Sequence, residues 1–233
     1  MDEWWSYRPS DLLMFSPAIY WRLFESLNRQ AWALPLGLAI VALVVSWRSA
    51  RGTDRGRISS ARAMVSLLAL GWLGVAWAFF WQQFAPIYTA APAFAWLFVA
   101  QGLGLMVLAF APGLRWATGH SARHIAGLLL AAWALVGHPA LAGLSGRPWV
   151  QAEWLALAPD PTALATLALL LLLDGSRHRF TRAWQRVLWV PPMLWCAATS
   201  LTLWTLGEAQ AWVVAVLAAL ALLAATGRSP DRG

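Results

Sequence analysis

The stretch RSARGTDRGRISSAR, residues 48–62, decides how this chain is organised, because it places five arginines between two long apolar runs. Basic residues in short loops next to membrane spans stay on the cytoplasmic side of a bilayer. We therefore expect residues 48–62 to form a cytoplasmic loop. The side on which this loop lies fixes the orientation of the segments before and after it.

The composition is that of a membrane protein. Of the 233 residues, 60% are hydrophobic and 12% are charged, whereas a soluble domain carries about 25% charged residues. Eighteen tryptophans suit a membrane–water interface, where an apolar ring with one N–H donor faces both phases. The formal net charge of +7 comes from arginines in short loops between apolar runs. Membrane topology accounts for such charges, so we expect no nucleic-acid partner.

Apolar runs predict an all-α, polytopic bundle of about seven transmembrane helices. The runs are residues 32–47, 64–84, 93–111, 125–144, 161–173, 187–206 and 209–226. Thirteen arginines fall on the side of residues 48–62 and one on the other side. This asymmetry predicts an external N-terminus and a cytoplasmic C-terminus. The domain division is then an external segment 1–31, a bundle 32–226 and a cytoplasmic tail 227–233.

The fifth run, residues 161–173, is too short to cross a bilayer of ~30 Å. It must cross if the arginines after it are to lie on the cytoplasmic side. We therefore expect it to extend outward to Trp154, with Asp160 near the lipid headgroups.

A short amphipathic helix is expected before the first span. Ser16 and Pro17 are typical of a helix N-cap and first helical position, and Glu25 and Arg29 are spaced for an ion pair. The apolar face includes Tyr20, Leu23, Phe24 and Leu27. The helix is interpreted as lying in the membrane interface. The alternative is a lid helix that packs on the bundle.

The N-terminal stretch carries a resemblance to a known family. It reads Trp4-Trp5-Ser6-Tyr7-Arg8-Pro9-Ser10-Asp11-Leu12-Leu13-Met14-Phe15-Ser16-Pro17, followed by Tyr20, Leu23, Phe24 and Asn28. It resembles a bacterial family of uncharacterised multi-pass membrane proteins, known only as a domain of unknown function. The resemblance implies a bacterial inner-membrane protein and implies no reaction, and the sequence leaves the cofactor unknown.

Few polar side chains fall within the predicted spans. His138 is a candidate ligand for a metal or tetrapyrrole, or a proton carrier, but it has no second membrane histidine beside it. We expect it to bond a backbone carbonyl freed by Pro139. The external acidic residues, with His138, are a candidate cation site. They are Glu153, Asp160 and Glu208, together with Asp11 and Glu25.

The external carboxylates lack the spacing of metal ligands, so we expect solvated loop charges and no metal site. At the opposite side, Asp174 is expected to pair with Arg177 and His178, which follow it at helical spacing.

Four tryptophans predicted at the external depth define a candidate apolar ligand site, and two glutamines beside them are candidates to orient a polar head. The residues are Trp77, Trp81, Trp96, Trp204, Gln82 and Gln83. The alternative is an aromatic belt that faces lipid.

The leading hypothesis is a non-enzymatic accessory or scaffold subunit, or a binder of an apolar ligand such as a lipid, quinone or pigment. Its expected partners are the bilayer and other membrane subunits. One alternative is a permease whose path is lined by Gln101, Cys196, Thr199 and Thr202. Another is a membrane enzyme that uses His138.

Overall fold

The computed structural model describes residues 15–31, 53–119 and 121–227, and single positions between 31 and 53. Most of the predicted first span, residues 32–47, and most of the N-terminal motif lie outside the described residues. The helices are α1 (Pro17–Ala31), α3 (Asp54–Val75), η2 (Ala76–Phe84), α4 (Ala91–Ala109), α5 (Ala122–Ala132), η3 (Trp133–Gly137), α6 (His138–Leu144), η4 (Trp149–Gln151), α7 (Pro159–Leu172), α8 (Arg179–Val187), α9 (Val190–Thr205) and α10 (Ala211–Thr226). Two short strands, β1 (Arg115–Trp116) and β2 (Leu173–Asp174), pair antiparallel.

Among the described residues, four continuous helical stretches are long and apolar enough to cross a membrane. They are Asp54–Phe84, Ala91–Ala109, Ala122–Leu144 and Arg179–Thr205. Each overlaps one of the predicted spans almost completely, and α7 and α10 are shorter apolar helices. The all-α class and the apolar helices of a membrane protein are thus confirmed.

The second half of the arginine-rich stretch is helical, so the prediction of a loop throughout residues 48–62 is wrong. Helix α3 begins at Asp54, and the Thr53 side chain accepts a hydrogen bond from the Gly56 backbone N–H. This threonine N-cap starts the helix before the apolar run begins. The basic side chains of Arg55, Arg57 and Arg62 therefore project from the first turns of α3.

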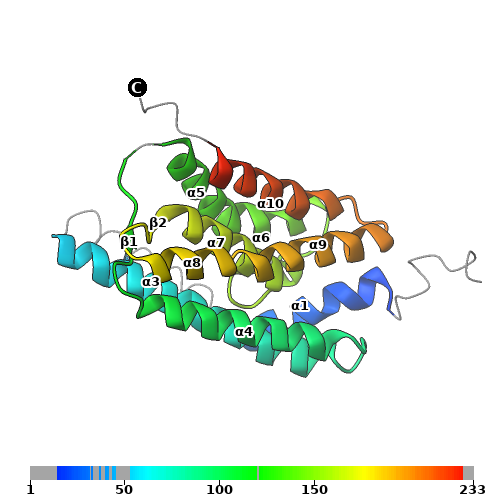
Figure 1. Ribbon diagram of the computed structural model, residues 1–233. Helices are drawn as coiled ribbons and strands as arrows, with labels where there is room; N and C mark the ends of the chain where they lie inside the picture. The colour runs from blue at the N-terminus through cyan, green and yellow to red at the C-terminus, as the bar shows by residue number, and fades with distance from the viewer. Residues whose placement is uncertain are drawn as a thin grey trace, which may run out of the picture.

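Helix α7 is the central element of the bundle. It packs against α3, α5, α9 and α10, and Figure 1 shows it between the α3–α4 pair and the α5–α10 pair. The helix begins at Pro159, so the expected helical extension to Trp154 is wrong. Ahead of it the chain turns through Ala156, which has a φ of 64°. At ~1.5 Å per residue, the 14 residues of α7 fall short of a bilayer, but neighbouring helices enclose α7.

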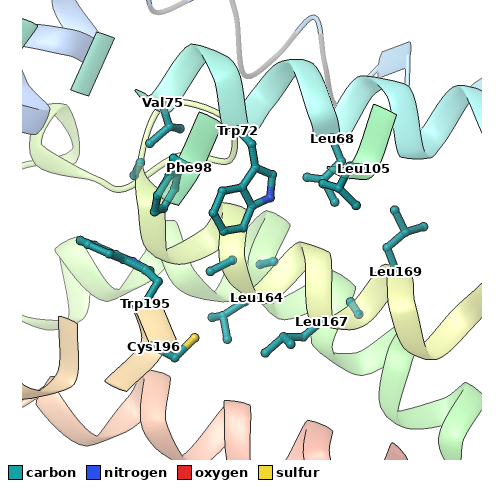
Figure 2. Close-up of a cluster of buried hydrophobic side chains, with 14 of the residues drawn as sticks. Leu68, Trp72, Val75, Phe98, Leu105, Leu164, Leu167, Leu169, Trp195 and Cys196 are labelled. Carbon is teal, nitrogen blue, oxygen red and sulfur yellow. The ribbon is translucent and has the colours of Figure 1, made fainter. Parts of the chain in front are cut away.

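The core joins α3, α4, α7 and α9. Figure 2 shows Trp72, Phe98 and Trp195 grouped against Leu164. The rings of Trp72 and Phe98 are 4.1 Å apart, and those of Phe98 and Trp195 are 5.4 Å apart. The buried Trp72 indole N–H donates a 2.7 Å hydrogen bond to the Thr166 hydroxyl. Aromatic packing and this polar bond fix α3 and α9 against the central helix.

The β1–β2 pair lies at one end of the bundle and carries an ion pair. The Arg115 guanidinium lies 2.9 Å from the Asp174 carboxylate. Asp174 also accepts a hydrogen bond from the Ser176 N–H. The prediction of a local pair with Arg177 and His178 is therefore wrong, because β2 continues as an extended segment after α7 and turns Asp174 toward β1. Burial alone would raise the pKa of Asp174, but hydrogen bonds from Ser176 and Arg115 outweigh burial and lower it.

Candidate metal centre

Helix α1 covers the end of the bundle that lies away from β1 and β2 (Figure 1). Its buried face packs on η2 and η4, and the ring of Phe24 stacks on Phe79 at 5.2 Å. The Asn28 side-chain amide donates two 2.8 Å hydrogen bonds, to the carbonyls of Val150 and Ala152. This arrangement is the one expected of a lid helix on the bundle.

The local predictions for α1 are confirmed. Its first turn receives the Ser16 cap, whose hydroxyl accepts a 3.4 Å hydrogen bond from the Ile19 N–H. The Arg29 guanidinium lies 2.8 Å from the Glu25 carboxylate, one helical turn away. Gln151 donates a hydrogen bond to the other oxygen of Glu25, which ties the polar face of α1 to η4.

Three ionisable side chains meet beneath this lid. His138 is the first residue of α6, Glu153 follows η4, and Asp160 lies in the first turn of α7. Their exposed fractions are 2%, 3% and 1%. One potential ligand atom from each residue lies within 4.8 Å of the other two, and Nε2 of His138 is 3.5 Å from Oε2 of Glu153. The structure thus gathers an imidazole and two carboxylates in a buried cluster, called here the His–Glu–Asp centre.

The three side chains of this centre differ in the hydrogen bonds that they make. Asp160 is well supplied, because its two oxygens accept hydrogen bonds from the Trp195 indole at 2.7 Å and the Thr199 hydroxyl at 3.1 Å. Both ring nitrogens of His138 and Oε1 of Glu153 have no hydrogen-bond partner among the described residues. A buried polar atom without a partner costs about 1–3 kcal/mol. These three atoms are therefore the ones that a bound ligand would satisfy.

The backbone on both sides of His138 helps to direct its side chain into the centre. A π-helical turn, η3, precedes it, and Pro139 occupies the first turn of α6. Single π-helical turns re-aim the residues that follow them and are frequent at functional sites. The ring nitrogens make no hydrogen bond within the described residues, so the expected bond to a carbonyl freed by Pro139 is wrong.

Glu153 and Asp160 are also buried, so their expected role as solvated loop charges is wrong. The segment between α6 and α7 folds under α1 and turns inward at Ala156. Thr162 stabilises this turn, because its hydroxyl accepts a hydrogen bond from the Ala156 N–H and donates one to the Ala158 carbonyl. No helical or strand periodicity marks such a segment in the sequence.

A second layer of polar groups surrounds the centre. The Arg147 guanidinium lies 3.4 Å from the centroid of the Trp21 ring and donates to the Gln210 side chain and the Gln151 carbonyl. The Trp21 indole in turn donates a 3.1 Å hydrogen bond to Glu208. These contacts connect α1 with the turn between α9 and α10. They close the centre from the end of the bundle.

A small cavity adjoins the centre. It measures about 10 Å³ and is lined in part by Tyr20, Trp195 and Thr199. A volume of this size holds about one water molecule. Burial raises the pKa of Tyr20 above its ordinary value, so the phenol stays neutral beside the cavity.

The donor set suits a divalent metal. Imidazole and carboxylate ligands bind Zn²⁺, Mn²⁺ and Fe²⁺. Ligand atoms on a tetrahedral metal with bonds of ~2.1 Å lie about 3.4 Å apart. The atoms of the centre lie within 4.8 Å of one another, so metal binding would require the side chains to close in by roughly an ångström.

The predicted tryptophan site lies at the surface. Trp77, Trp96 and Trp204 are 61%, 63% and 53% exposed. Trp81 is half-buried and its ring makes edge contacts with Trp77 at 6.0 Å and with Trp96 at 5.4 Å. Three of the four rings thus form an aromatic surface cluster on η2 and α4, and their exposure matches the belt alternative better than a pocket.

The two glutamines beside this surface cluster differ in exposure. Gln82 is exposed and Gln83 is half-buried.

The residues of the predicted permease path make separate hydrogen bonds in the structure. Gln101 donates a hydrogen bond to the Leu188 carbonyl, and Thr202 donates to the Ala198 carbonyl within α9. Cys196 is buried in the core. Thr199 bonds to Asp160 of the His–Glu–Asp centre, and Thr199 and Thr202 both line the small cavity beside it.

Sequence reasoning named Glu153 and Asp160 but placed them in water, and it gave Trp195 no role in the site. One signal was available. Asp160 stands between two prolines at the start of a short, uniformly apolar run. A run too short for the bilayer is typical of a helix buried inside the protein, and a carboxylate at its first turn is then buried as well.

Comparison with known proteins identifies a family. No curated protein and no solved structure matches the chain. Residues 17–232 match the model of a family of unknown function, DUF6064. Because this match covers nearly all of the sequence, the chain belongs to the DUF6064 family.

Proposed function

We propose that this chain is a non-enzymatic integral membrane protein that binds one divalent transition-metal ion in the His–Glu–Asp centre. The observation that carries the proposal is the set of unpaired atoms there. Among the described residues, Nδ1 of His138 and Oε1 of Glu153 have no hydrogen-bond partner, and Nε2 of His138 has only a 3.5 Å contact with Oε2 of Glu153. The ligand atoms of the cluster lie within 4.8 Å of one another. A metal ion would satisfy an imidazole nitrogen and the carboxylates at once.

An internal ion pair explains the same groups less well. A protonated His138 would offset one of two carboxylates, and its 3.5 Å separation from Glu153 is long for a hydrogen bond. Arg147 directs its described hydrogen bonds to Gln151 and Gln210. Buried charges are costly unless they are paired and hydrogen-bonded. A bound cation supplies the missing charge and the missing bonds together.

The closed geometry favours binding over catalysis. A substrate site for a small molecule usually measures about 300–1,000 Å³, whereas the cavity beside the centre measures about 10 Å³. Helix α1 covers the centre and is held to the segment beneath it by Asn28. A metal ion enclosed in this way would link three parts of the fold: α6, α7 and the loop that follows η4. Such a link supports a scaffold or accessory role.

A cobalt titration tests the proposal. Co²⁺ bound by nitrogen and oxygen ligands is visible by absorption, and we expect the protein in detergent to take up about one Co²⁺ per chain, as a closed three-residue site would. Loss of one ligand in His138→Gln, Glu153→Gln or Asp160→Asn should weaken binding by at least about tenfold. His178→Gln is the control, because His178 is exposed and lies outside the centre. Equal titrations for all five proteins would refute the proposal.

We further propose the seven-span topology, with the His–Glu–Asp centre on the external side of a bacterial inner membrane. The arginine distribution supports it. The basic residues of α3, β1 and α8 lie at the β1–β2 end, and Arg147 lies at the α1 end. Cysteine labelling in intact cells, in a Cys196→Ser background, tests the orientation. We expect an external reagent to label position 151 and to leave position 55 unlabelled. The reverse pattern would overturn it.

A further inference from the structure

A second candidate site lies at the β1–β2 end of the bundle, where α8 packs on α4. Two hydrogen bonds from α8 fix this contact. The Trp184 indole donates to the Gly104 carbonyl at 2.8 Å, and the Thr181 hydroxyl donates to the Pro112 carbonyl at 2.6 Å. Figure 1 shows α8 alongside α4. The two helices therefore hold the surface between them in a defined shape.

An apolar groove runs along this contact. Its volume is about 540 Å³, and its walls include Leu103, Met106 and Val107 of α4, Phe110 at the end of α4, and Phe180 of α8. Leu103, Val107, Phe110 and Phe180 are all exposed. The Phe180 ring stacks on Trp184 at 6.1 Å, which holds one wall in place. On a candidate membrane span, exposed apolar side chains that line a groove are suited to contact with a lipid acyl chain.

One edge of the groove is strongly basic. Arg179 precedes Phe180 in the chain, and Arg177 lies against Gly113, which follows the groove residue Pro112. Arg182 and Arg186 add further charge to the exposed face of α8, and the helix contains no acidic residue. Among the described residues, Arg177 and Arg179 form no ion pair. The apolar groove thus lies next to a chain segment that carries two exposed arginines.

We propose that this groove binds an anionic phospholipid, with one acyl chain along α4 and the headgroup phosphate held by Arg177 and Arg179. Guanidinium groups bind phosphate oxygens in a bidentate manner, and basic residues beside membrane spans attract anionic lipids. The groove is apolar and elongated along a helix, which suits an acyl chain. The site lies at the opposite end of the bundle from the His–Glu–Asp centre and is independent of it.

Native mass spectrometry with defined lipids tests this site. The purified protein is exchanged into detergent with phosphatidylglycerol or with phosphatidylcholine, and the retained lipid is counted. We expect the wild type to retain phosphatidylglycerol and to release phosphatidylcholine. Arg177→Gln/Arg179→Gln should reduce retention of phosphatidylglycerol about tenfold or more, since each arginine near an anionic lipid contributes about 1 kcal/mol.

Two further variants distinguish lipid binding in the groove from a general attraction of anionic lipid to positive charge. Arg55→Gln/Arg62→Gln removes the same charge from the exposed start of α3 and should retain the lipid as the wild type does. Val107→Trp fills the groove, leaves every arginine in place and should lose the lipid. Equal loss in both arginine double variants, equal retention of the two lipids, or full retention by Val107→Trp would each overturn the proposal. If Arg177→Gln/Arg179→Gln fails to fold, the Val107→Trp result decides alone.

Discussion

The indole N–H of Trp195 in α9 donates a 2.7 Å hydrogen bond to Oδ1 of Asp160, in the first turn of α7. Thr199, one turn further along α9, donates to the other oxygen of the same carboxylate at 3.1 Å. Each oxygen keeps a second lone pair for another partner. Helix α9 therefore sets the position of Asp160 relative to His138 and Glu153, which both come from elements before α7.

Removing the Trp195 bond is expected to weaken metal binding without removing a ligand. Partners that orient a ligand usually contribute a factor of about 10–100 to metal affinity, so Trp195→Phe should reduce Co²⁺ affinity at least about tenfold. Trp204→Phe is the matched control, because Trp204 lies on the same helix and is exposed. If Trp195→Phe lowers the melting temperature and leaves Co²⁺ affinity unchanged, Trp195 is structural only.

The docking of α1 is expected to depend on Asn28. Its two hydrogen bonds to Val150 and Ala152 should each contribute about 1 kcal/mol. Asn28→Ala should therefore raise hydrogen exchange across residues 17–31 by up to about 30-fold. Gln30→Ala serves as the control, since Gln30 is exposed and its described side-chain hydrogen bond goes to Ser26 on the same helix. Equal exchange in the two variants would show that apolar packing alone holds α1.

The buried Trp72 is expected to contribute strongly to stability. Trp72→Phe removes the hydrogen bond to Thr166 and leaves space between α3 and α7, so we expect a loss of about 1–3 kcal/mol. The same change at the exposed Trp77 should have little effect. Thermal unfolding in detergent measures both. Similar melting temperatures for the two variants would contradict the central position of Trp72 in the core.

The Arg115–Asp174 pair is expected to stabilise the fold in a pH-dependent way. The pKa of Asp174 is lowered, because hydrogen bonds from Ser176 and Arg115 outweigh its burial. A carboxylate with a lowered folded pKa contributes stability that is complete above its unfolded pKa of about 3.9 and is lost as the pH falls through the folded pKa. Asp174→Asn should thus lower the melting temperature at pH 7. This difference should shrink at pH values below about 4, and a constant difference would contradict the assignment.

Hydrophobic run length predicted most of the bundle, and the exceptions have local causes. Helix α3 begins early because Thr53 caps it ahead of the apolar run. Helix α7 is short because its neighbours enclose it, so the bilayer does not set its length. Run length reports apolarity and cannot distinguish a helix that faces lipid from one that faces protein.

The His–Glu–Asp centre was harder to predict. His138 and Asp160 belong to different helices and Glu153 to a loop, so no short spacing connects them. Their burial depends on α1 and on the turn at Ala156, a non-glycine residue with a positive φ. Such a conformation leaves no recognisable mark in the sequence. The burial of Glu153 and Asp160 therefore depends on tertiary packing, which the local sequence pattern does not reveal.

Metal content tests the central claim most directly. The wild type and Glu153→Gln/Asp160→Asn would be incubated with Zn²⁺, separated from free metal by gel filtration and analysed for zinc, with circular dichroism to establish that both are folded. We expect about one zinc per wild-type chain, as for a closed three-ligand site, and almost none in the double variant. Zinc-free wild type, or equal zinc in the two folded proteins, would contradict the assignment of the His–Glu–Asp centre as a metal site.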